Sequence, residues 1–376
     1  MDFDLTESQS ALRDEVRTFA EETIEPRAAA LDANEEYPAD VMAELGERRL
    51  TGLTLPERFG GRDEGWVELA VVVEELSAAM MPVASALALH HGVAAVLDRF
   101  GTDEQRERFL PEMARFETVC ALGLSEENAG SDKLAMETRA EHDGNEWVID
   151  GHKRWVTNFL DADYVLTYAK TGPDADAPHS VSAFLVPAEE FEVETVWDTL
   201  GARAVKSPKV TLSGVRVPDE AMVGEEGEAY VRRGEVPNGV NLPARGVGIA
   251  RAALAETREY VRDRRQFGQS VGDFQGVRWR LAEMAQRVDA ARLLTFRAAH
   301  RADEGGDVAR ELSMAKVYAT EAAVDTASDA MDLHGGIGYT TERPVERYLR
   351  DAKLLTVAGG PNDLHRNTVG ERVLEG

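Results

Sequence analysis

The spacing of apolar residues changes twice along this chain of 376 residues, and this change constrains the fold more than any other feature. Helical spacing predominates over residues 1–118, apolar and polar residues alternate over 119–222, and helical spacing returns within 223–376. A period near 3.6 predicts amphipathic helices, whereas a period of two predicts half-buried strands. The sequence therefore predicts an α+β protein of three domains: an N-terminal helical domain, a middle all-β domain and a C-terminal helical domain.

Local motifs support this division. Capping boxes at Thr6–Gln9 and Thr102–Gln105 predict two helix starts, and residues 67–97 are apolar on most faces, which predicts a buried helix or helix pair. Asp143-Gly144, between two alternating segments, is typical of a β-hairpin turn. The C-terminal region has one long apolar stripe, which comprises Val277, Leu281, Met284, Val288 and Ala291, and a second long helix that we expect to end at Gly335-Gly336.

Composition excludes several classes of function. The chain has 69 acidic and 42 basic residues, a net charge of −27 spread along its length, so we expect neither nucleic acid nor a membrane as a partner. Such a surface is typical of proteins adapted to high intracellular salt. Cys120 is the single cysteine, and the eight histidines form no metal-spaced cluster, so we expect no disulfide and no metal. The N-terminus lacks a signal-like segment and no run of 18 apolar residues occurs, which favours a cytoplasmic protein without a membrane span.

Three short motifs combine residues suited to a ligand. Leu122–Lys133, "LGLSEENAGSDK", mixes small and hydroxyl residues that can approach a polar ring edge or a phosphate. Arg154–Asn158, "RWVTN", places a tryptophan beside a threonine hydroxyl. Arg262–Gln275, "RDRRQFGQSVGDFQ", contains an arginine cluster suited to phosphate oxygens. "GGIG" at Gly335–Gly338 follows a predicted helix, so it is not a dinucleotide-binding fingerprint.

The order and spacing of these motifs resemble the acyl-CoA dehydrogenase family of flavoproteins. "LPERFGG", "FGTDEQRERFLPEMA", "SEENAGSD", "RWVTN", "RRQFG…FQ", "LHGGIGY" and "RDAK" carry the resemblance, which covers essentially the whole chain. It implies a helical domain, a β-barrel-like domain and a C-terminal four-helix bundle, assembled as a homotetramer or homodimer. It also implies FAD as cofactor, an acyl-CoA substrate and an electron-transferring flavoprotein as electron acceptor.

The resemblance further assigns the residues that contact FAD. Trp155 and Thr157 would lie against the flavin, with the Thr157 hydroxyl near N5. Other contacts would come from Leu122, Leu124, Ser125, Gly130, Ser131, Arg264, Phe267, Gln275, Asp332, Gly335, Gly336, Gly360 and Asn362. Arg264, Phe267 and Gln275 would act across a subunit interface on the pyrophosphate and adenosine, as would the segment 332–336, in which Asp332 replaces a common glutamine.

The expected reaction is α,β-dehydrogenation of the thioester, with a glutamate as base and hydride transfer to flavin N5. Here the chain departs from the family, because both positions known for that glutamate lack a carboxylate. They are occupied by Gly359, in "LLTVAGGPNDLHR", and Asn238, in "EVPNGVNLPARG".

Three explanations remain open. Glu235 would supply the base from a shifted loop, or Asp363 or His365 would act from the altered loop. Otherwise the protein is a flavin oxidase or monooxygenase on the same fold, or a non-catalytic FAD-binding paralogue.

Overall fold

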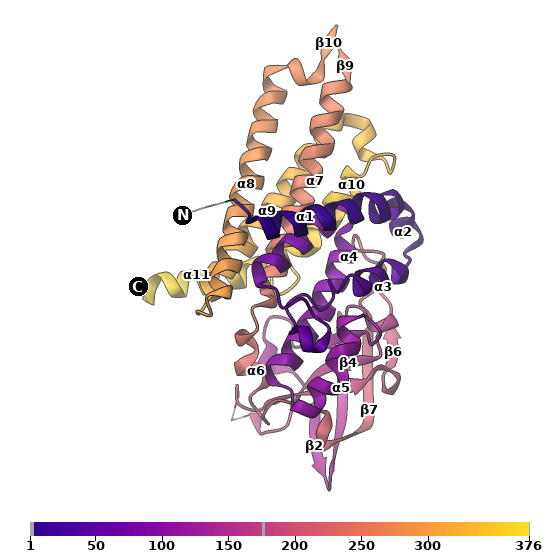
Figure 1. Ribbon diagram of the computed structural model, residues 1–376, viewed down its shortest axis with the longest axis vertical. Coiled ribbons are helices and arrows are strands. Elements are labelled where there is room, and N and C mark those ends of the chain that lie inside the picture. The colour runs from indigo at the N-terminus through magenta and orange to yellow at the C-terminus, as the bar shows by residue number, and fades with distance from the viewer. Residues whose placement is uncertain (1–3, 175–176, 376) are drawn as a thin grey trace.

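A computed structural model describes residues 4–174 and 177–375 of the chain. Helices come first, a sheet follows, and helices return, so the predicted fold class is confirmed (Figure 1). The N-terminal helices are α1 (Glu7–Phe19), α2 (Ala28–Asn34), α3 (Ala39–Glu47), α4 (Trp66–Phe100) and α5 (Asp103–Ala114). Both capping boxes form: the Thr6 and Thr102 hydroxyls each accept the N–H of the glutamine three residues later.

Helix α4 forms the centre of the molecule. It contains one break at Met80, where φ is −159° and ψ is 105°, two residues before Pro82. Its length and composition would suffice to cross a membrane, contrary to the expectation from run length alone, but 83% of its most apolar window is buried inside the protein. Such burial is typical of a core helix. One hydrophobic core joins α4 to α1, and another joins α4 to α5 and the sheet.

In the described part of the chain, eight strands form one mixed sheet in the order β6-β7-β3-β2-β4-β5-β8, with β1 parallel to β4. The strands are β1 (Cys120–Gly123), β2 (Arg139–Asp143), β3 (Glu146–Lys153), β4 (Tyr164–Lys170), β5 (Val181–Pro187), β6 (Glu192–Thr195), β7 (Lys209–Pro218) and β8 (Met222–Val223). Strands β2 and β3 form the predicted hairpin around Asp143-Gly144. The sheet has its own core on one face, around Trp147 and Phe184.

The C-terminal helices form a bundle around α9. They are α6 (Ala229–Arg232), α7 (Asn241–Asp263), α8 (Gln275–Asp303), α9 (Ala309–His334), α10 (Val345–Leu355) and α11 (Asn362–Glu375). A small hairpin of β9 (Arg265–Gln266) and β10 (Gln269–Ser270) connects α7 to α8 at the end of the molecule far from β2 (Figure 1). Because α4 also packs against α7 and α8, the N-terminal and C-terminal helices share one interface. The boundaries at 118/119 and 222/223 stay predictions.

Candidate active site

The first predicted group of ligand residues is brought together above the sheet. The Arg154 N–H donates to the Ser125 carbonyl at 2.7 Å, so the segment after β1 runs beside the segment after β3. Trp155 follows with a left-handed φ of 59° and a side chain that is 52% exposed. A half-exposed tryptophan on a strained backbone is unusual for a structural residue, and this favours a contact surface.

A buried ion pair fixes these two segments. The Lys153 ammonium lies 2.6 Å from the Glu126 carboxylate, and neither side chain is more than 1% exposed. Glu126 also accepts the backbone N–H groups of Glu137 and Thr138. Burial lowers the pKa of Lys153 to about 8, whereas the adjacent ammonium keeps the pKa of Glu126 below its usual value against the opposing effect of burial. The pair therefore holds Ser125 and Trp155 in register.

The surface around Trp155 offers an aromatic face and hydroxyl groups. The Trp155 ring lies 5.3 Å from the Trp197 ring, and the Thr157 and Ser207 hydroxyls are 3.0 Å apart. The remaining members of this group range from buried to exposed: Leu124 is buried, Leu122 is partly buried, and Gly130 and Ser131 are exposed. The structure thus brings Ser125 and Trp155 together, and these remaining members of the predicted set lie on β1 or on the segment that follows it.

The second predicted group lies at the opposite end of the molecule. Arg264 ends α7, Phe267 is 93% exposed at the tip of the β9–β10 hairpin, and Gln275 begins α8. Tyr260, one turn before Arg264, donates to the His334 carbonyl at 3.2 Å, which brings the C-terminal end of α9 to the same place. Within one chain, this group is not brought to Trp155, as expected if it serves a neighbouring subunit.

The three predicted residues at the end of α9, Asp332, Gly335 and Gly336, differ in their surroundings. Asp332 is held by Arg280 at 3.3 Å, so its carboxylate already has a partner. Gly335 caps the helix with φ 64°, a conformation that favours glycine, and it is followed by Gly336 in a short 3₁₀ segment, Gly335–Tyr339.

In the glycine loop between α10 and α11, a side chain at Gly359 would require the Leu242 side chain to shift. A Cβ there would lie 2.3 Å from Leu242 Cδ1, and φ is 65°. Buried Lys316 ties the loop down: its ammonium donates to the Gly360 carbonyl at 2.7 Å and to Asn362 Oδ1 at 2.6 Å. The loop is therefore closed and anchored on α7 and α9 without a carboxylate at position 359.

The other usual base position faces α4. The Asn238 amide donates to the Ala88 carbonyl at 3.0 Å, and its oxygen lies 3.4 Å from His91 Nδ1. Burial lowers the pKa of His91 to about 4, so this histidine is neutral at pH 7. The side chain of Asn238 thus fixes the start of α7 on α4.

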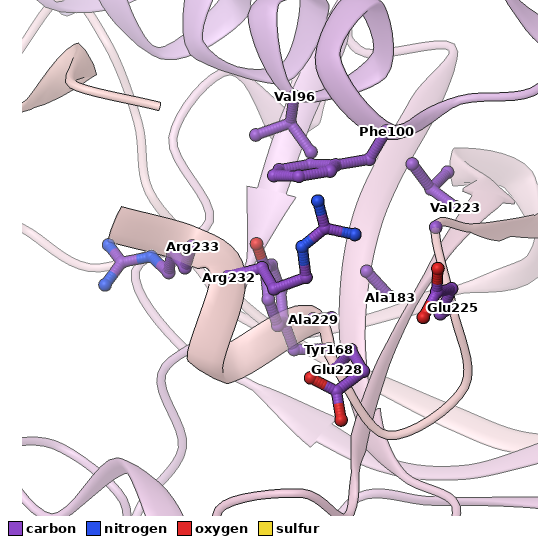
Figure 2. A pocket seen from close by; sticks show the side chains of 11 residues that line it. Val96, Phe100, Tyr168, Ala183, Val223, Glu225, Glu228, Ala229, Arg232 and Arg233 are labelled. Atoms are coloured by element: carbon purple, nitrogen blue, oxygen red, sulfur yellow. The ribbon is translucent and has the colours of Figure 1, made fainter. Parts of the chain in front are cut away.

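Glu235 lies among arginines at the C-terminal end of α4. Its carboxylate pairs with Arg99 at 3.0 Å and with Arg232 at 2.9 Å, and these hydrogen bonds lower its pKa. Arg232 also stacks on Phe100 at 4.7 Å, beside a pocket of only about 20 Å³ (Figure 2). Arg99 is eight residues beyond His91, about 12 Å along the helix. Action as the base would require Glu235 to leave both arginines, so its assignment stays a prediction.

The two alternatives in the altered loop are also engaged. Asp363 is an exposed partner of Arg366 at 2.9 Å, and its side chain is 91% exposed. His365 Nε2 lies 3.1 Å from the Gly359 carbonyl and Nδ1 lies 3.1 Å from Ser313 Oγ. The first contact requires a proton on Nε2, and burial lowers the pKa of this histidine, which leaves Nδ1 to accept from Ser313. Both ring nitrogens are thus occupied in this conformation.

Sequence reasoning missed Arg245, one turn beyond Leu242 on α7. Its side chain is 3% exposed and hydrogen-bonds to Ser85 and Asn241. The signal was available, because this arginine lies in the small and apolar run "NLPARGVGIA". A charged residue inside an apolar run at the start of a helix indicates a buried charge.

Comparison with known proteins identifies the class. The N-terminal, middle and C-terminal domain models of the acyl-CoA dehydrogenase family match residues 6–117, 121–215 and 239–374. The chain belongs to the acyl-CoA dehydrogenase family. A Bacillus subtilis relative, "Probable acyl-CoA dehydrogenase YngJ", is 34% identical over 100% of both chains. The short-chain-specific acyl-CoA dehydrogenase of Clostridium acetobutylicum is 32% identical over 99% of this chain and 100% of its own.

Solved structures agree with these sequence matches. A chain in a structure of the electron transferring flavoprotein of Acidaminococcus fermentans has a TM-score of 0.97 at 31% identity, with 100% of both chains covered. The butyryl-CoA dehydrogenase of Megasphaera elsdenii has a TM-score of 0.95 at 30% identity, also over 100% of both chains. A glutaryl-coenzyme A dehydrogenase complex with glutaryl-CoA has a TM-score of 0.95 at 31% identity, covering 100% of this chain and 97% of the other.

The residues present fit FAD, the cofactor of this family. A solved FAD complex of PigA superposes with a TM-score of 0.94 at 26% identity over 100% of both chains. In this chain, the half-exposed Trp155 face and the nearby Thr157 hydroxyl suit a planar ring with polar edges, and Arg264 suits a pyrophosphate.

Proposed function

We propose that this protein is an FAD-dependent acyl-CoA dehydrogenase that oxidises the α,β bond of an acyl-CoA thioester. The observation that carries the proposal is the continuity of the match, because all three domains align over nearly their full length with proteins of that name. FAD, when bound, supplies a two-electron acceptor that takes the β-hydride at N5. The chain supplies Trp155 and Thr157 to orient the flavin ring, and the loop anchored by Lys316 to exclude water.

The α-proton must leave to a base on the protein, and its identity is the open part of this proposal. We keep Glu235 as the candidate, reached by rearrangement of the segment between α6 and α7. Gly239 permits such a rearrangement because its φ is free, and Pro237 favours an irregular segment there because it lacks a backbone N–H. Glu235→Gln should then abolish flavin bleaching by acyl-CoA and leave FAD content unchanged. Undiminished bleaching in that variant rules Glu235 out.

A second candidate function follows from the lack of a carboxylate at Gly359 and Asn238. A site without a base on either usual position suits a flavin oxidase or monooxygenase, or a non-catalytic FAD-binding paralogue. The discriminating experiment is anaerobic mixing of the yellow protein with a panel of saturated acyl-CoAs, with flavin absorbance as the readout. Bleaching supports the dehydrogenase. Absence of bleaching with rapid O₂ consumption after chemical reduction supports the oxidase, and neither response supports the paralogue. A protein that purifies without flavin and cannot be reconstituted contradicts all three.

We further infer the partners and setting from the family. Electrons would leave to an electron-transferring flavoprotein, and the chain would form a homotetramer or homodimer in the cytoplasm of a halophilic organism. The exposed Phe267 supports the oligomer, because a large apolar side chain at a hairpin tip is better covered than solvated. Sedimentation equilibrium in molar KCl tests the assembly, and a monomer at micromolar concentration would contradict it.

A further inference from the structure

Arg245 is a buried cation for which the described residues provide no acid. Its guanidinium donates through Nη1 to Ser85 Oγ and through Nη2 to Asn241 Oδ1, both at 2.7 Å, and Nε is buried without a partner. A guanidinium has five N–H donors, so these two hydrogen bonds leave most of its capacity unused. Burial lowers its pKa to about 10, which still leaves it charged at pH 7. Burying a charge without a counter-ion is costly, so this arrangement requires an explanation.

The position of Arg245 places it beside the expected acyl chain. Leu242 and Arg245 lie about one turn apart at the start of α7, and Asn238 lies in the 3₁₀ turn Asn238–Val240 that leads into this helix. Asn238 and the Leu242–Gly359 contact mark the two usual base positions, where the substrate α-carbon would lie. Helical side chains point toward the N-terminus, and Arg245 does so by bonding to Asn241 one turn back. Its guanidinium is therefore displaced from the base positions by about one to two helical turns.

The facing side of this interface is polar as well. Ser85, Ala88 and His91 follow one another on α4, and each contacts this end of the bundle: Ser85 contacts Arg245, whereas Ala88 and His91 contact Asn238. The interface between α4 and α7 (Figure 1) thus contains a row of hydrogen-bonding groups that ends at a guanidinium for which the described residues provide no counter-ion. A row of this kind suits an acyl group with a polar end better than a plain hydrocarbon chain.

We propose that Arg245 and Ser85 select an acyl group whose far end carries a carboxylate, so that the substrate is the mono-CoA thioester of a short dicarboxylic acid. This inference rests on the proposed function, because it places the thioester at the site assigned there. The carboxylate binds Arg245 through Nε and one Nη in the two-pronged geometry that guanidinium and carboxylate share. The substrate then supplies the counter-ion that the described residues do not provide. Asn241 and Ser85 hold the guanidinium until the ligand enters and yield by side-chain rotation.

The test uses ligands that cannot be oxidised, so that binding is measured without turnover. S-(4-carboxybutyl)-coenzyme A and S-pentyl-coenzyme A are thioethers of equal chain length that differ in the terminal carboxylate. Titration calorimetry of the holoenzyme should show the carboxylate ligand binding at least about tenfold more tightly, as expected for a charge-assisted hydrogen bond. The preference should fall to less than about threefold in Arg245→Met. Arg258→Met, an exposed arginine on the same helix, is the matched control and should keep it.

Each outcome decides the proposal. Equal binding of the two thioethers by wild-type protein, or tighter binding of S-pentyl-coenzyme A, overturns it even if Arg245→Met fails to fold. A carboxylate preference that persists in Arg245→Met overturns the role of Arg245. A carboxylate preference without flavin bleaching by any acyl-CoA would refute the proposed dehydrogenation and support this inference. Bleaching by pentanoyl-CoA together with equal binding of the two thioethers would support the proposed dehydrogenation and refute this inference.

Discussion

Lys153 and Arg245 are both buried cations, but they are compensated in different ways. Lys153, under the predicted flavin surface, is 0% exposed and has the Glu126 carboxylate at 2.6 Å. Arg245, between α4 and α7, is 3% exposed, and among the described residues its guanidinium hydrogen-bonds to a hydroxyl and an amide oxygen. The charge of Lys153 is therefore balanced within the protein. In the proposal above, the charge of Arg245 is balanced only when a ligand carboxylate binds beside it.

A shortage of acidic residues does not explain this difference. Arg251, on the same helix as Arg245, pairs with both Glu74 and Glu75 of α4, at 3.2 and 2.6 Å. Those two glutamates are almost fully buried and also bind Arg292 and Arg17. Helix α4 thus supplies acids opposite one arginine of α7 and a serine opposite the other. The contrast between the two arginines separates a scaffold function from a recognition function.

The largest effect is expected at Lys153. Lys153→Met leaves Glu126 buried without a cation, and breaking a buried pair in this way costs about 3–5 kcal/mol. Thermal melting of the holoenzyme in molar KCl should show a fall of several degrees. Lys170→Met is the control: Lys170 pairs with Asp174, whose side chain is 65% exposed, and its loss should matter much less. Equal melting temperatures for the two variants would mean that the Lys153–Glu126 pair does not stabilise the sheet.

A buried acid without full compensation should give a pH-dependent effect of intermediate size. Burial raises the pKa of Asp351 to about 6, against the hydrogen bond from the Ala202 N–H. The folded state then holds a proton that the unfolded state has released, so Asp351 costs stability as pH rises from about 4 to about 6. Such a shift corresponds to about 3 kcal/mol at most. The melting temperature of Asp351→Asn, relative to that of wild type, should therefore increase from pH 4.5 to pH 7. A difference between the two melting temperatures that does not change with pH would contradict this prediction.

At Arg245 we expect a small effect on the free energy of unfolding, opposite in sign to the effect of Lys153→Met. Arg245→Met removes a buried charge that lacks a counter-ion, so the free energy of unfolding should stay the same or rise by about 1–2 kcal/mol. Denaturant unfolding of the ligand-free holoenzyme measures it. A loss of more than about 2 kcal/mol would indicate that Arg245 is a structural residue of the α4–α7 interface.

Features set by residues close together in the sequence were predicted better than features set by contacts between distant segments. The Thr6 and Thr102 capping boxes and the Asp143-Gly144 hairpin are local, and all three form as expected. A buried helix or helix pair was expected over residues 67–97, but the position of the break at Met80, two residues before Pro82, was not predicted. The compensation of Lys153 and Arg245 depends on which residues of distant segments face them.

The candidate site shows the same division. Family motifs placed Ser125 and Trp155 together, and the structure brings them to one surface. The contact of Gly359 with Leu242 could not be predicted from the loop, because Leu242 lies more than a hundred residues earlier. The two arginines that hold Glu235 likewise became visible only in three dimensions.

The smallest effect concerns how salt acts on buried and exposed pairs. Screening by molar KCl relieves repulsion among the 69 acidic residues, so the melting temperature of wild type should rise with salt. The penalty of Lys153→Met should change by less than about 0.5 kcal/mol over the same range, because buried pairs are screened little. Arg216→Met, which removes exposed pairs with Asp143 and Glu146, is the matched contrast, and its effect should vanish in molar KCl. A flat melting temperature for wild type would contradict the halophilic origin, and a strongly salt-dependent penalty at Lys153 would mean that water reaches the pair.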